Sequence, residues 1–437
     1  MKTIFSKEAK KVLDTIENTS LNVFVTGKAG TGKSTLLQHL RMHAHDKIIV
    51  LAPTGIAAVN VNGDTIHSFF TLKPGFEKAE ATKMNLDQKK KVKFKQIKTI
   101  AIDEISMVRA DLLDAIDIVL RRTRGNDKPF GGVQMVFFGD LYQLPPVVTP
   151  NDQEKFFSEY EAPYFFEADV FNGQRTLFSS GFKLKIIELK KIYRQKDKKF
   201  IEILNSVRDN TISPEQLDSL NERFDMNFTP PKGKKYIHLM TTNRGASYIN
   251  TAYLEKLNAE EVSFPAEIVG DIKRNLYPND ENIVLRVGAQ VMFISNDSER
   301  RWVNGTLGKV IDVVEEIDEK SGESELIVIV EKEGGEIVEV KKHLWEISRY
   351  VFNKGEFERE NLGSFYQMPM KLAWAITIHK SQGKTFENVI IDLERGSFAH
   401  GQTYVALSRC TSLSGLVLKK KLYKSNIIMD PRVNDFK

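Results

Sequence analysis

The sequence contains very little cysteine, and Cys410 is the single one among its 437 residues. One cysteine excludes a disulfide bond within the chain and a zinc site built from several cysteines, and it suits a reducing compartment. No run of about 20 apolar residues occurs, as a membrane-spanning helix would need. The segment from Met1 to Ser20 is charged and lacks the apolar core of a signal peptide. We therefore expect an intracellular protein without a membrane-spanning segment.

A strong excess of charge of one sign is also missing. The 63 lysines and arginines are set against 58 aspartates and glutamates, which leaves a net charge of +5. A nucleic-acid-binding surface would therefore have to be local. With 41% hydrophobic and 28% charged residues, the composition is typical of a folded protein rather than a disordered one. The length predicts about three domains at roughly 150 residues each.

The first half of the sequence alternates apolar runs with helical patterns, which is typical of a parallel sheet covered on both faces. The expected strands are Asn22 to Thr26, Lys47 to Thr54, Thr99 to Ser106 and Val133 to Asp140. The lysine-rich segment Pro74 to Lys98 lies between the second and third strands, has no clear period and is expected to form an inserted subdomain. Within it, Lys89 to Phe94 forms either a solvated face or a patch that contacts phosphates.

A second α/β unit is expected to begin near Phe178. Its expected elements are the strand Ile186 to Leu189, the helix Lys198 to Arg208, and the strands Tyr236 to Thr242 and Asn388 to Leu393. An all-β stretch from Val262 to Asn361 interrupts this unit. There, Glu325 to Glu331 and Glu336 to Lys341 flank the residues KEGG, which predicts a β-hairpin with a glycine turn. The sequence thus predicts two α/β units, the second of which contains a small β barrel.

The strongest motif is GKAGTGKST, from Gly27 to Thr35, which matches a P-loop and lies between an expected strand and an expected helix. Its glycines allow the backbone N–H groups to face phosphate oxygens at a helix N-terminus. Lys33 would neutralise the β and γ phosphates, and the Ser34 hydroxyl would bind Mg²⁺. No N-K-x-D motif for guanine occurs. The motif therefore predicts an ATP site.

Two further strand ends carry candidate catalytic residues, at the edge where doubly wound sheets bind ligands. Asp103 would hold Mg²⁺ through water, and Glu104 would orient or deprotonate the attacking water. The next strand ends in GDLYQLPP, in which Gln143 is a candidate γ-phosphate sensor and Asp140 a candidate loop anchor. An acidic pair after a strand is otherwise an ordinary solvated turn, but the upstream P-loop favours the catalytic interpretation.

Two arginines of the expected second unit are candidates for the same chemistry. Arg194 lies in LKKIYRQ, and Arg409 lies in VALSRC. Each is either a surface arginine or an arginine finger, which stabilises the transferred phosphate and contributes ~10³-fold or more to the rate.

Eight blocks, taken in order, resemble the superfamily-one helicases of the 5′-to-3′ group. They are GKAGTGKST, APTGIAA, TIHSFF, DEIS, GDLYQLPP, YRQ, AITIHKSQGKTF and QTYVALSRC. The resemblance is greatest to the PIF (petite integration frequency) family, with RecD-like helicases next, and it covers nearly the whole chain. It implies an ATP-driven motor that moves 5′ to 3′ on single-stranded DNA. Its substrates would be junctions of single and double strands or other structures such as G-quadruplexes and RNA–DNA hybrids.

The family fold implies two RecA-like domains in tandem, with ATP in the cleft between them and DNA across their tops. On this sequence, domain 1A covers residues 1–64 and 99–177, the wedge-forming insertion 1B covers 65–98, domain 2A covers 178–261 and 362–437, and an SH3-like β insertion, 2B, covers 262–361. ATP and Mg²⁺ are the expected cofactors. A monomer is expected, and the sequence names no protein partner.

The resemblance also assigns roles residue by residue. The residues implied to bind the nucleotide are Gly27, Ala29, Gly30, Thr31, Gly32, Lys33, Ser34, Thr35, Gln382 and Gly383. The last two would couple DNA to ATP, with Lys384 as a weaker candidate. The residues implied to contact DNA are Thr54, Gly55, His67, Ser68, Thr377, His379, Lys380 and Ser381. Such short donors suit sequence-independent contacts with phosphates. Phe69, Phe70 and Phe76 are candidates for stacking on bases, although the first two fit core packing better.

The sequence departs from the family pattern near its N-terminus. Family members commonly carry a glutamine there that recognises adenine, whereas this sequence has Ala9 in SKEAKKVL. Backbone contacts, Asn18 or Asn22 remain as candidates for that role.

Two other functions are compatible with the P-loop. One is a non-motor ATPase switch, which would need neither the TIHKSQG block nor turnover stimulated by DNA. The other is a RecD-like subunit of a nuclease complex, in which a partner would cleave the DNA, because the sequence shows no nuclease-like cluster of carboxylates. The expected location is the cytoplasm, with a bacterial or phage origin, or the nucleus or mitochondrion for a eukaryotic source.

Overall fold

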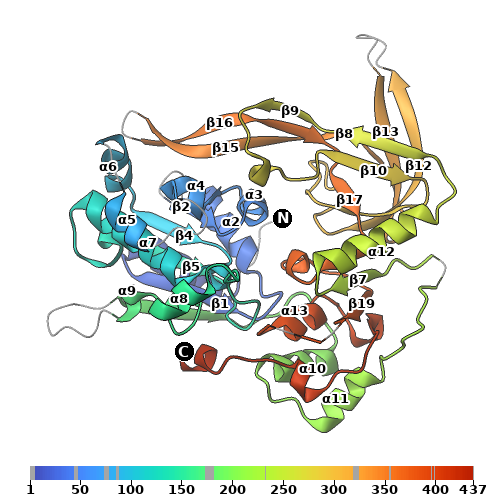
Figure 1. Cartoon of the computed structure of the whole chain (residues 1–437), viewed down its shortest axis with the longest axis horizontal. Coiled ribbons are helices and arrows are strands. Elements are labelled where there is room, and N and C mark those ends of the chain that lie inside the picture. The colour runs from blue at the N-terminus through green and yellow to red at the C-terminus, as the bar shows by residue number, and fades with distance from the viewer. Residues whose placement is uncertain are drawn as a thin grey trace. The chain divides into compact units, whose positions relative to one another are not determined.

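A computed structural model of the chain describes residues 5–43, 48–72, 78–84, 88–172, 182–231, 233–317, 324–353, 356–394, 396–397 and 399–436 (Figure 1). The chain forms two compact units. Unit 1 consists of Met1–Tyr193, Ser348–Asn361 and Asp430–Lys437, and unit 2 consists of Arg194–Ile347 and Leu362–Met429.

Unit 1 is built on a six-stranded sheet in the order β3-β2-β4-β5-β1-β6. Every pair in it is parallel. The strands are β1 (Asn22–Gly27), β2 (Ile48–Ala52), β3 (Asp64–Thr65), β4 (Thr99–Ile102), β5 (Gln134–Phe138) and β6 (Leu184–Leu189). The four strands expected in the first half of the sequence are therefore confirmed. Their buried, β-branched and aromatic residues suit a sheet that is covered on both faces.

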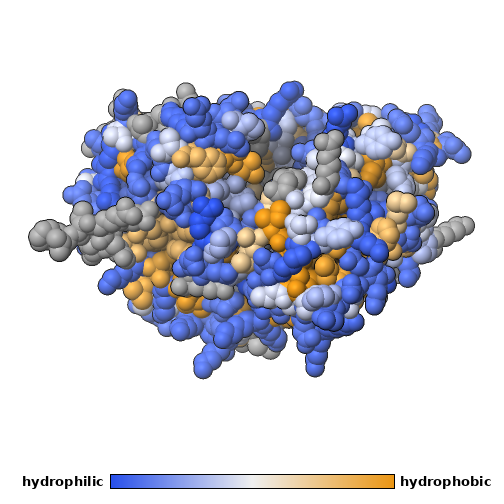
Figure 2. Space-filling model, turned by 60° about the horizontal axis from the view of Figure 1, so that its bottom comes forward, coloured by the Kyte–Doolittle hydropathy of each residue, from blue (hydrophilic) through white to orange (hydrophobic). Residues whose placement is uncertain are grey.

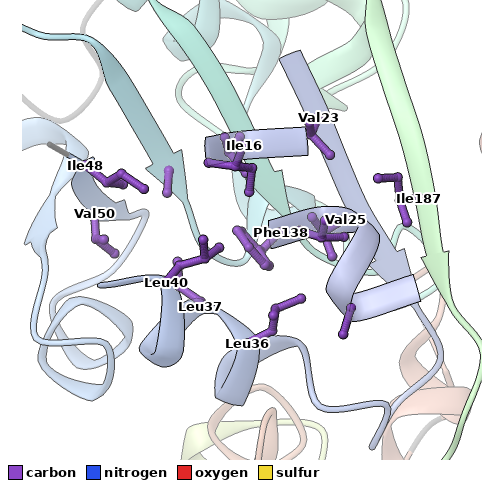
Figure 3. Packing of buried hydrophobic residues seen from close by; sticks show 14 of the residues in the cluster. Ile16, Val23, Val25, Leu36, Leu37, Leu40, Ile48, Val50, Phe138 and Ile187 are labelled. Carbon is purple, nitrogen blue, oxygen red and sulfur yellow. The ribbon is translucent and has the colours of Figure 1, made fainter. Parts of the chain in front are cut away.

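The helices of unit 1 include two that cover one face of this sheet. They are α1 (Lys7–Asn18) and α2 (Lys33–His43). Figure 3 shows Leu36, Leu37 and Leu40 of α2 directed toward Val25 and Phe138 of the sheet. The others are α3 (Gly55–Asn60), α4 (Ile66–Phe70), α5 (Lys78–Lys83), α6 (Gln88–Lys95), α7 (Ala110–Arg124), α8 (Gln153–Glu159), α9 (Asp169–Asn172) and α14 (Arg432–Asp435). The face covered by α1 and α2 therefore forms a hydrophobic core between these helices and the strands that flank the P-loop.

Three segments belong to unit 1 although the sequence placed them elsewhere. The expectation that a second α/β unit begins near Phe178 is wrong, because β6 is an edge strand of the first sheet and pairs with β1. The C-terminal residues also pack here, where Phe436 stacks on Phe166 with ring centroids 4.5 Å apart. The segment Ser348–Asn361 is the third, and Arg359 donates a hydrogen bond of 2.7 Å to the Asn62 carbonyl.

The expected insertion at 65–98 is helical where it is described, with α4, α5 and α6. Phe69 and Phe70 are buried, and Phe70 stacks on Phe94 with centroids 5.4 Å apart, so core packing is confirmed for both. Lys93 lies over the Phe69 ring, 4.2 Å from its centroid. The lysine-rich segment is therefore not simply a solvated face, because its last turn packs inward. Phe76 lies outside the described residues.

The α/β part of unit 2 has a four-stranded parallel sheet in the order β18-β7-β19-β20. Its strands are β7 (Ile237–Met240), β18 (Ala375–Thr377), β19 (Val389–Asp392) and β20 (Leu416–Leu418). The accompanying helices are α10 (Lys198–Arg208), α11 (Pro214–Asn221), α12 (Asn243–Glu255) and α13 (Gln402–Ser408). The expected helix from Lys198 to Arg208 is confirmed, and Asp197 caps its N-terminus by accepting from the Phe200 N–H.

The β part of unit 2 has a five-stranded sheet in the order β14-β13-β12-β11-β17, a pair β10-β8, and a three-stranded sheet β15-β16-β9. The strands are β8 (Glu261–Pro265), β9 (Glu267–Gly270), β10 (Asn282–Arg286), β11 (Gln290–Phe293), β12 (Leu307–Ile317), β13 (Ser324–Lys332), β14 (Ile337–Val340), β15 (His343–Asn353), β16 (Glu356–Gln367) and β17 (Met370–Leu372). The expected hairpin around KEGG is confirmed, because β13 and β14 pair antiparallel. The turn-proximal residues of β15 and β16 belong to unit 1.

The face of the molecule in Figure 2 is mainly hydrophilic, with hydrophobic residues in separate patches. Among the described residues, no helix has both the length and the apolar character that crossing a bilayer requires.

Candidate nucleotide and nucleic-acid sites

The P-loop of unit 1 connects β1 to α2, as the motif predicts. Gly30 and Gly32 have φ angles of +79° and +86°, in the left-handed region that glycine adopts without strain. A side chain at Gly27 would come within 2.6 Å of the Leu189 carbonyl oxygen of β6. The loop therefore requires glycine at these positions for two reasons, backbone conformation and close approach to a neighbouring strand.

The Lys33 ammonium folds over the loop and donates to the Gly27 carbonyl at 2.6 Å. Thr31 also fastens the loop, because its hydroxyl donates to the Lys28 carbonyl at 2.9 Å. Ser34 and Thr35 are exposed in the first turn of α2. The loop therefore presents a cation, a helix N-terminus and two hydroxyls together, which is the donor set that a polyphosphate needs.

Asp103 and Glu104 directly follow β4, at the same carboxyl edge of the sheet. The Asp103 N–H donates to the Leu51 carbonyl at 2.9 Å, which continues the pairing with β2. Burial and the neighbouring Glu104 carboxylate raise the pKa of Asp103 to about 7, while Lys33 acts in the opposite direction. Glu104 has a φ of +48°, so the backbone turns sharply after Asp103. The structure thus brings Asp103, Glu104 and Lys33 into one electrostatic environment.

Asp140 anchors the loop after β5, as expected. Its carboxylate accepts from the Tyr142 N–H at 3.3 Å and from the Gln143 side-chain amide at 3.2 Å. Both Asp140 and Gln143 are buried. The Gln143 side chain is therefore held in place by Asp140 at the strand edge that carries Asp103.

Arg194 and Arg409 of unit 2 both bind the turn formed by residues 381–384. Arg194 donates to the Gly383 carbonyl at 3.1 Å. Arg409 donates to the carbonyls of Ser381 and Lys384, each at 3.3 Å. They differ in exposure, because Arg194 is half-buried whereas Arg409 is 1% exposed. Arg409 is thus an integral part of the packing of unit 2 and not an ordinary surface arginine.

Four predicted DNA contacts lie on unit 1, at the carboxyl ends of β2 and β3. Thr54 caps α3 by accepting from the Ala57 N–H at 3.3 Å, and Gly55 begins that helix. His67 and Ser68 lie in α4. Burial lowers the pKa of His67, so the imidazole favours its neutral form. The four residues occupy the same sheet edge as the P-loop, where α/β sheets bind ligands.

The other four predicted DNA contacts follow β18 in unit 2. His379 and Lys380 are accessible, and burial lowers the pKa of His379. Thr377 is buried, and its hydroxyl accepts from the Lys380 N–H at 3.2 Å. Ser381 is fully buried, and its hydroxyl donates to the Ile378 carbonyl at 2.7 Å. The side chains of Thr377 and Ser381 therefore shape the turn, whereas His379 and Lys380 are available to a ligand.

The residues considered for adenine recognition have structural partners. Ala9 is buried in α1. The Asn22 amide donates to the Lys183 carbonyl at 3.2 Å and accepts from the Met135 N–H at 2.8 Å. It therefore connects β1 to β5 and to the residue that precedes β6. Asn18 donates to Asp14 at 2.8 Å. The side chain of Asn22 is thus already engaged as donor and acceptor, which disfavours it as an adenine reader.

The sequence reasoning missed Lys371, a half-buried lysine of β17. Its charge interacts with that of Lys380 and with that of Lys384. The local signal was present, because Lys371 is an ionisable residue inside the otherwise apolar run MPMKLAW. No motif covers this run, and the pattern alone does not show which loop the strand meets.

The parallel sheet, the glycine-rich loop and the acidic pair together define a P-loop nucleotide-binding protein, and a second parallel α/β unit accompanies it. Comparison with known proteins narrows this class. Residues 4–218 match the family model of the PIF1-like helicases. The chain is 37% identical to Pif1 from Bacteroides sp. in its crystal structure with ADP-AlF4, with a TM-score of 0.87, and the match covers 100% of this chain and 96% of that one. The chain belongs to the PIF1-like helicase family.

Two further relatives extend this comparison. The ATP-dependent DNA helicase Pif1 of Psychrobacter sp. is 34% identical over 456 residues, which cover 92% of this chain. The chain spans 66% of the length of that relative. The structure of Bacteroides Pif1 bound to single-stranded DNA is 36% identical with a TM-score of 0.67, over 100% of this chain and 96% of that chain.

Proposed function

We propose that the chain is an ATP-dependent DNA helicase that moves 5′ to 3′ along single-stranded DNA and unwinds duplexes and other DNA structures, including G-quadruplexes or RNA–DNA hybrids. The observation that carries the proposal is the P-loop with Asp103 and Glu104 beside Lys33 in a chain that belongs to the PIF1-like helicases. The polarity rests on family resemblance. Relatives that are named DNA helicases, and one solved with single-stranded DNA, support the substrate.

The nucleotide site divides into binding and chemistry. The backbone of residues 27–35 and the Lys33 ammonium bind the phosphates of ATP. Glu104 orients or deprotonates the attacking water, and Gln143 responds to the γ-phosphate from the position in which Asp140 holds it. Arg194 and Arg409 stabilise the charge on the transferred phosphate. Gln382 and Gly383 couple the hydrolysis of ATP to the bound DNA.

The residues present fit Mg²⁺. Ser34 offers an exposed hydroxyl, and Asp103 offers a carboxylate whose burial raises its pKa, so a nearby cation would stabilise the ionised form. At nucleotide sites, Mg²⁺ is usually bound by one or two carboxylates, several waters and the phosphates. Ser34 and, through water, Asp103 would hold it. When bound, it neutralises charge on the phosphate oxygens.

DNA is gripped through its backbone. The accessible donors His67, Ser68, His379 and Lys380, with the backbone around Thr54 and Gly55, suit phosphates of any sequence. Thr377 and Ser381 act by shaping the second loop. Movement requires that the DNA affinity of these contacts differs between nucleotide states. A ligand that binds both states equally does not shift the equilibrium between them.

The subdomains of the family are assigned here by proposal. Unit 1 provides the RecA-like domain 1A with its insertion 1B at 65–98, and unit 2 provides domain 2A together with the SH3-like insertion 2B. The β sheets between β8 and β17 support the last assignment. A monomer bound to junctions of single and double strands is the proposed working state, and the cytoplasm is the proposed location.

The polarity is tested with two partial duplexes that differ only in the end of the overhang. With ATP and Mg²⁺, unwinding is expected from the duplex with a 5′ single-stranded overhang and not from the duplex with a 3′ overhang. Strand separation is followed by fluorescence of a labelled strand. Unwinding from the 3′ overhang alone contradicts the polarity, and turnover of ATP without unwinding of either duplex favours a switch.

A further inference from the structure

Three lysines gather in unit 2 where the five-stranded sheet meets the turn after β18. They are Lys371 of β17, Lys380 of the short 3₁₀ helix His379–Ser381, and Lys384 of the following turn. Their charges interact, because Lys380 disfavours the charged form of Lys371, which does the same to Lys384. Among the described residues, no ion pair engages any of the three. The Asp280 carboxylate acts on Lys371 in the opposite direction, and a further anion near the lysines would stabilise their charged forms.

Lys371 is half-buried, whereas Lys380 is exposed. Its neighbours in β17, Met370 and Leu372, pack against the core of the β part, so the lysine projects from the opposite face of the strand. Burial lowers its pKa, Lys380 lowers it further, and Asp280 acts in the opposite direction. In the part of the chain that the structure describes, no hydrogen bond reaches its ammonium group. A half-buried cation in this environment is suited to an anionic ligand.

Lys384 faces the same region from the α/β part of unit 2. Its ammonium donates to the side chain of Asn304, in the loop between β11 and β12. That loop is fixed, because the Asn304 N–H donates to Asn296 at 2.8 Å and the Val303 N–H donates to Thr306 at 3.2 Å. Burial and the charge of Lys371 lower the pKa of Lys384 to about 8. Lys384 and Asn304 are thus in contact at a fixed loop, and Lys371, which pairs with Met292 of the strand that leads into this loop, acts on Lys384 through its charge.

We propose that Lys371, Lys384 and Asn304 form a binding site for a backbone phosphate of single-stranded DNA, beside His379 and Lys380. Lysine acts as a point charge toward phosphate without base specificity, as a sequence-independent motor needs. The inference rests on the proposed helicase function, because it takes DNA as the source of the phosphate.

The site is joined to the arginines proposed for ATP hydrolysis. The carbonyl of Lys384 accepts from Arg409, and the carbonyl of Gly383 accepts from Arg194. A phosphate held by the Lys384 ammonium is therefore linked through one turn to both arginines. The same turn of unit 2 therefore carries the proposed DNA contact and positions the two arginines proposed for ATP hydrolysis.

The test compares Lys371→Met and Lys384→Met with the wild-type chain, using a fluorescent oligothymidylate, anisotropy and no nucleotide. Methionine keeps an unbranched apolar side chain and removes the charge. Each variant is expected to bind about tenfold more weakly. The slope of log affinity against log salt should become shallower by about 0.7 for each phosphate that the variant no longer neutralises. The matched control is Lys341→Met, because Lys341 is exposed, directly follows β14 of the same sheet and pairs with Glu316.

A pH series provides a second readout. Wild-type affinity is expected to fall as the pH rises from 7 to 9, because Lys384 loses its proton around its lowered pKa of about 8. Lys384→Arg stays charged over this range and should show a smaller fall. An equal fall in wild type and Lys384→Arg counts against a role of Lys384 in holding phosphate.

The outcomes separate this site from the helicase proposal. A wild-type chain that does not bind oligothymidylate overturns both. Wild-type binding with unchanged affinity and salt slope in folded Lys371→Met and Lys384→Met overturns the site alone. Weaker DNA binding in both variants, with the Lys341→Met control unaffected, supports it.

Discussion

Lys33→Ala is expected to reduce ATP hydrolysis at least about a hundredfold, the scale on which a single charge-stabilising donor acts in an active site. The ammonium lies over the loop within 2.6 Å of the Gly27 carbonyl, so it is already placed where phosphate oxygens would enter. Steady-state release of phosphate with Mg²⁺ and single-stranded DNA measures the loss.

The same variant should keep its affinity for single-stranded DNA in the absence of nucleotide, because none of the proposed DNA contacts lies in the P-loop. The matched control is Lys10→Ala, an exposed lysine on α1 of the same unit. Loss of DNA affinity together with hydrolysis in a folded Lys33→Ala chain would contradict the separation of the two sites.

Arg194→Ala and Arg409→Ala are both expected to lower turnover, by about a thousandfold for a residue that acts as an arginine finger. Their effects on stability should differ. Arg409 is 1% exposed and donates to three backbone carbonyls, so its removal takes away several buried hydrogen bonds and leaves a cavity. That change is expected to cost about 3 kcal/mol or more, which lowers the melting temperature by roughly 6–12 °C for a unit of this size. Arg194→Ala should lower the stability much less, because Arg194 is only half-buried.

Thermal unfolding and single-turnover hydrolysis, measured on both variants, separate the two roles. Arg194→Lys serves as the control, because it keeps the charge and loses the planar fork of donors. If Arg409→Ala lowers the melting temperature and leaves turnover unchanged, Arg409 is a purely structural residue. If Arg194→Ala leaves turnover unchanged, Arg194 has no part in the chemistry.

Local patterns in the sequence were sufficient for much of the first sheet and for the P-loop. Strand β1, helix α2 and the pair Asp103 and Glu104 follow from short-range signals, because alternation, glycine spacing and burial are all encoded within a few residues. The hairpin of β13 and β14 followed from a glycine turn between two β-type runs for the same reason.

The rest depends on which distant segments meet. The pattern of β6 identifies a strand, and nothing in it shows that the partner is β1 rather than a strand of unit 2. The Phe436 side chain returns to unit 1 because it completes an aromatic cluster with Phe24 and Phe166, residues far away in the sequence. For the same reason the sequence did not single out Lys371. Its charge interacts with those of Lys380 and Lys384, which lie beyond β18 in the sequence.

Motif resemblance also overstated how directly some residues act. Ser381 and Thr377 sit inside a DNA-contact motif, yet their hydroxyls are used to build the turn. Asn22 was a candidate for adenine recognition, but its amide links β1 to its neighbours. A short polar side chain in a tight turn satisfies the backbone first, because a buried N–H or C=O without a partner is costly.

The central claim is that hydrolysis of ATP is coupled to single-stranded DNA. Steady-state hydrolysis with Mg²⁺, measured with and without an unstructured oligonucleotide, tests it most directly. The account predicts turnover that rises at least tenfold with DNA and saturates with its concentration. Turnover that is the same with and without DNA, in a chain that hydrolyses ATP, would contradict the motor and indicate a P-loop switch.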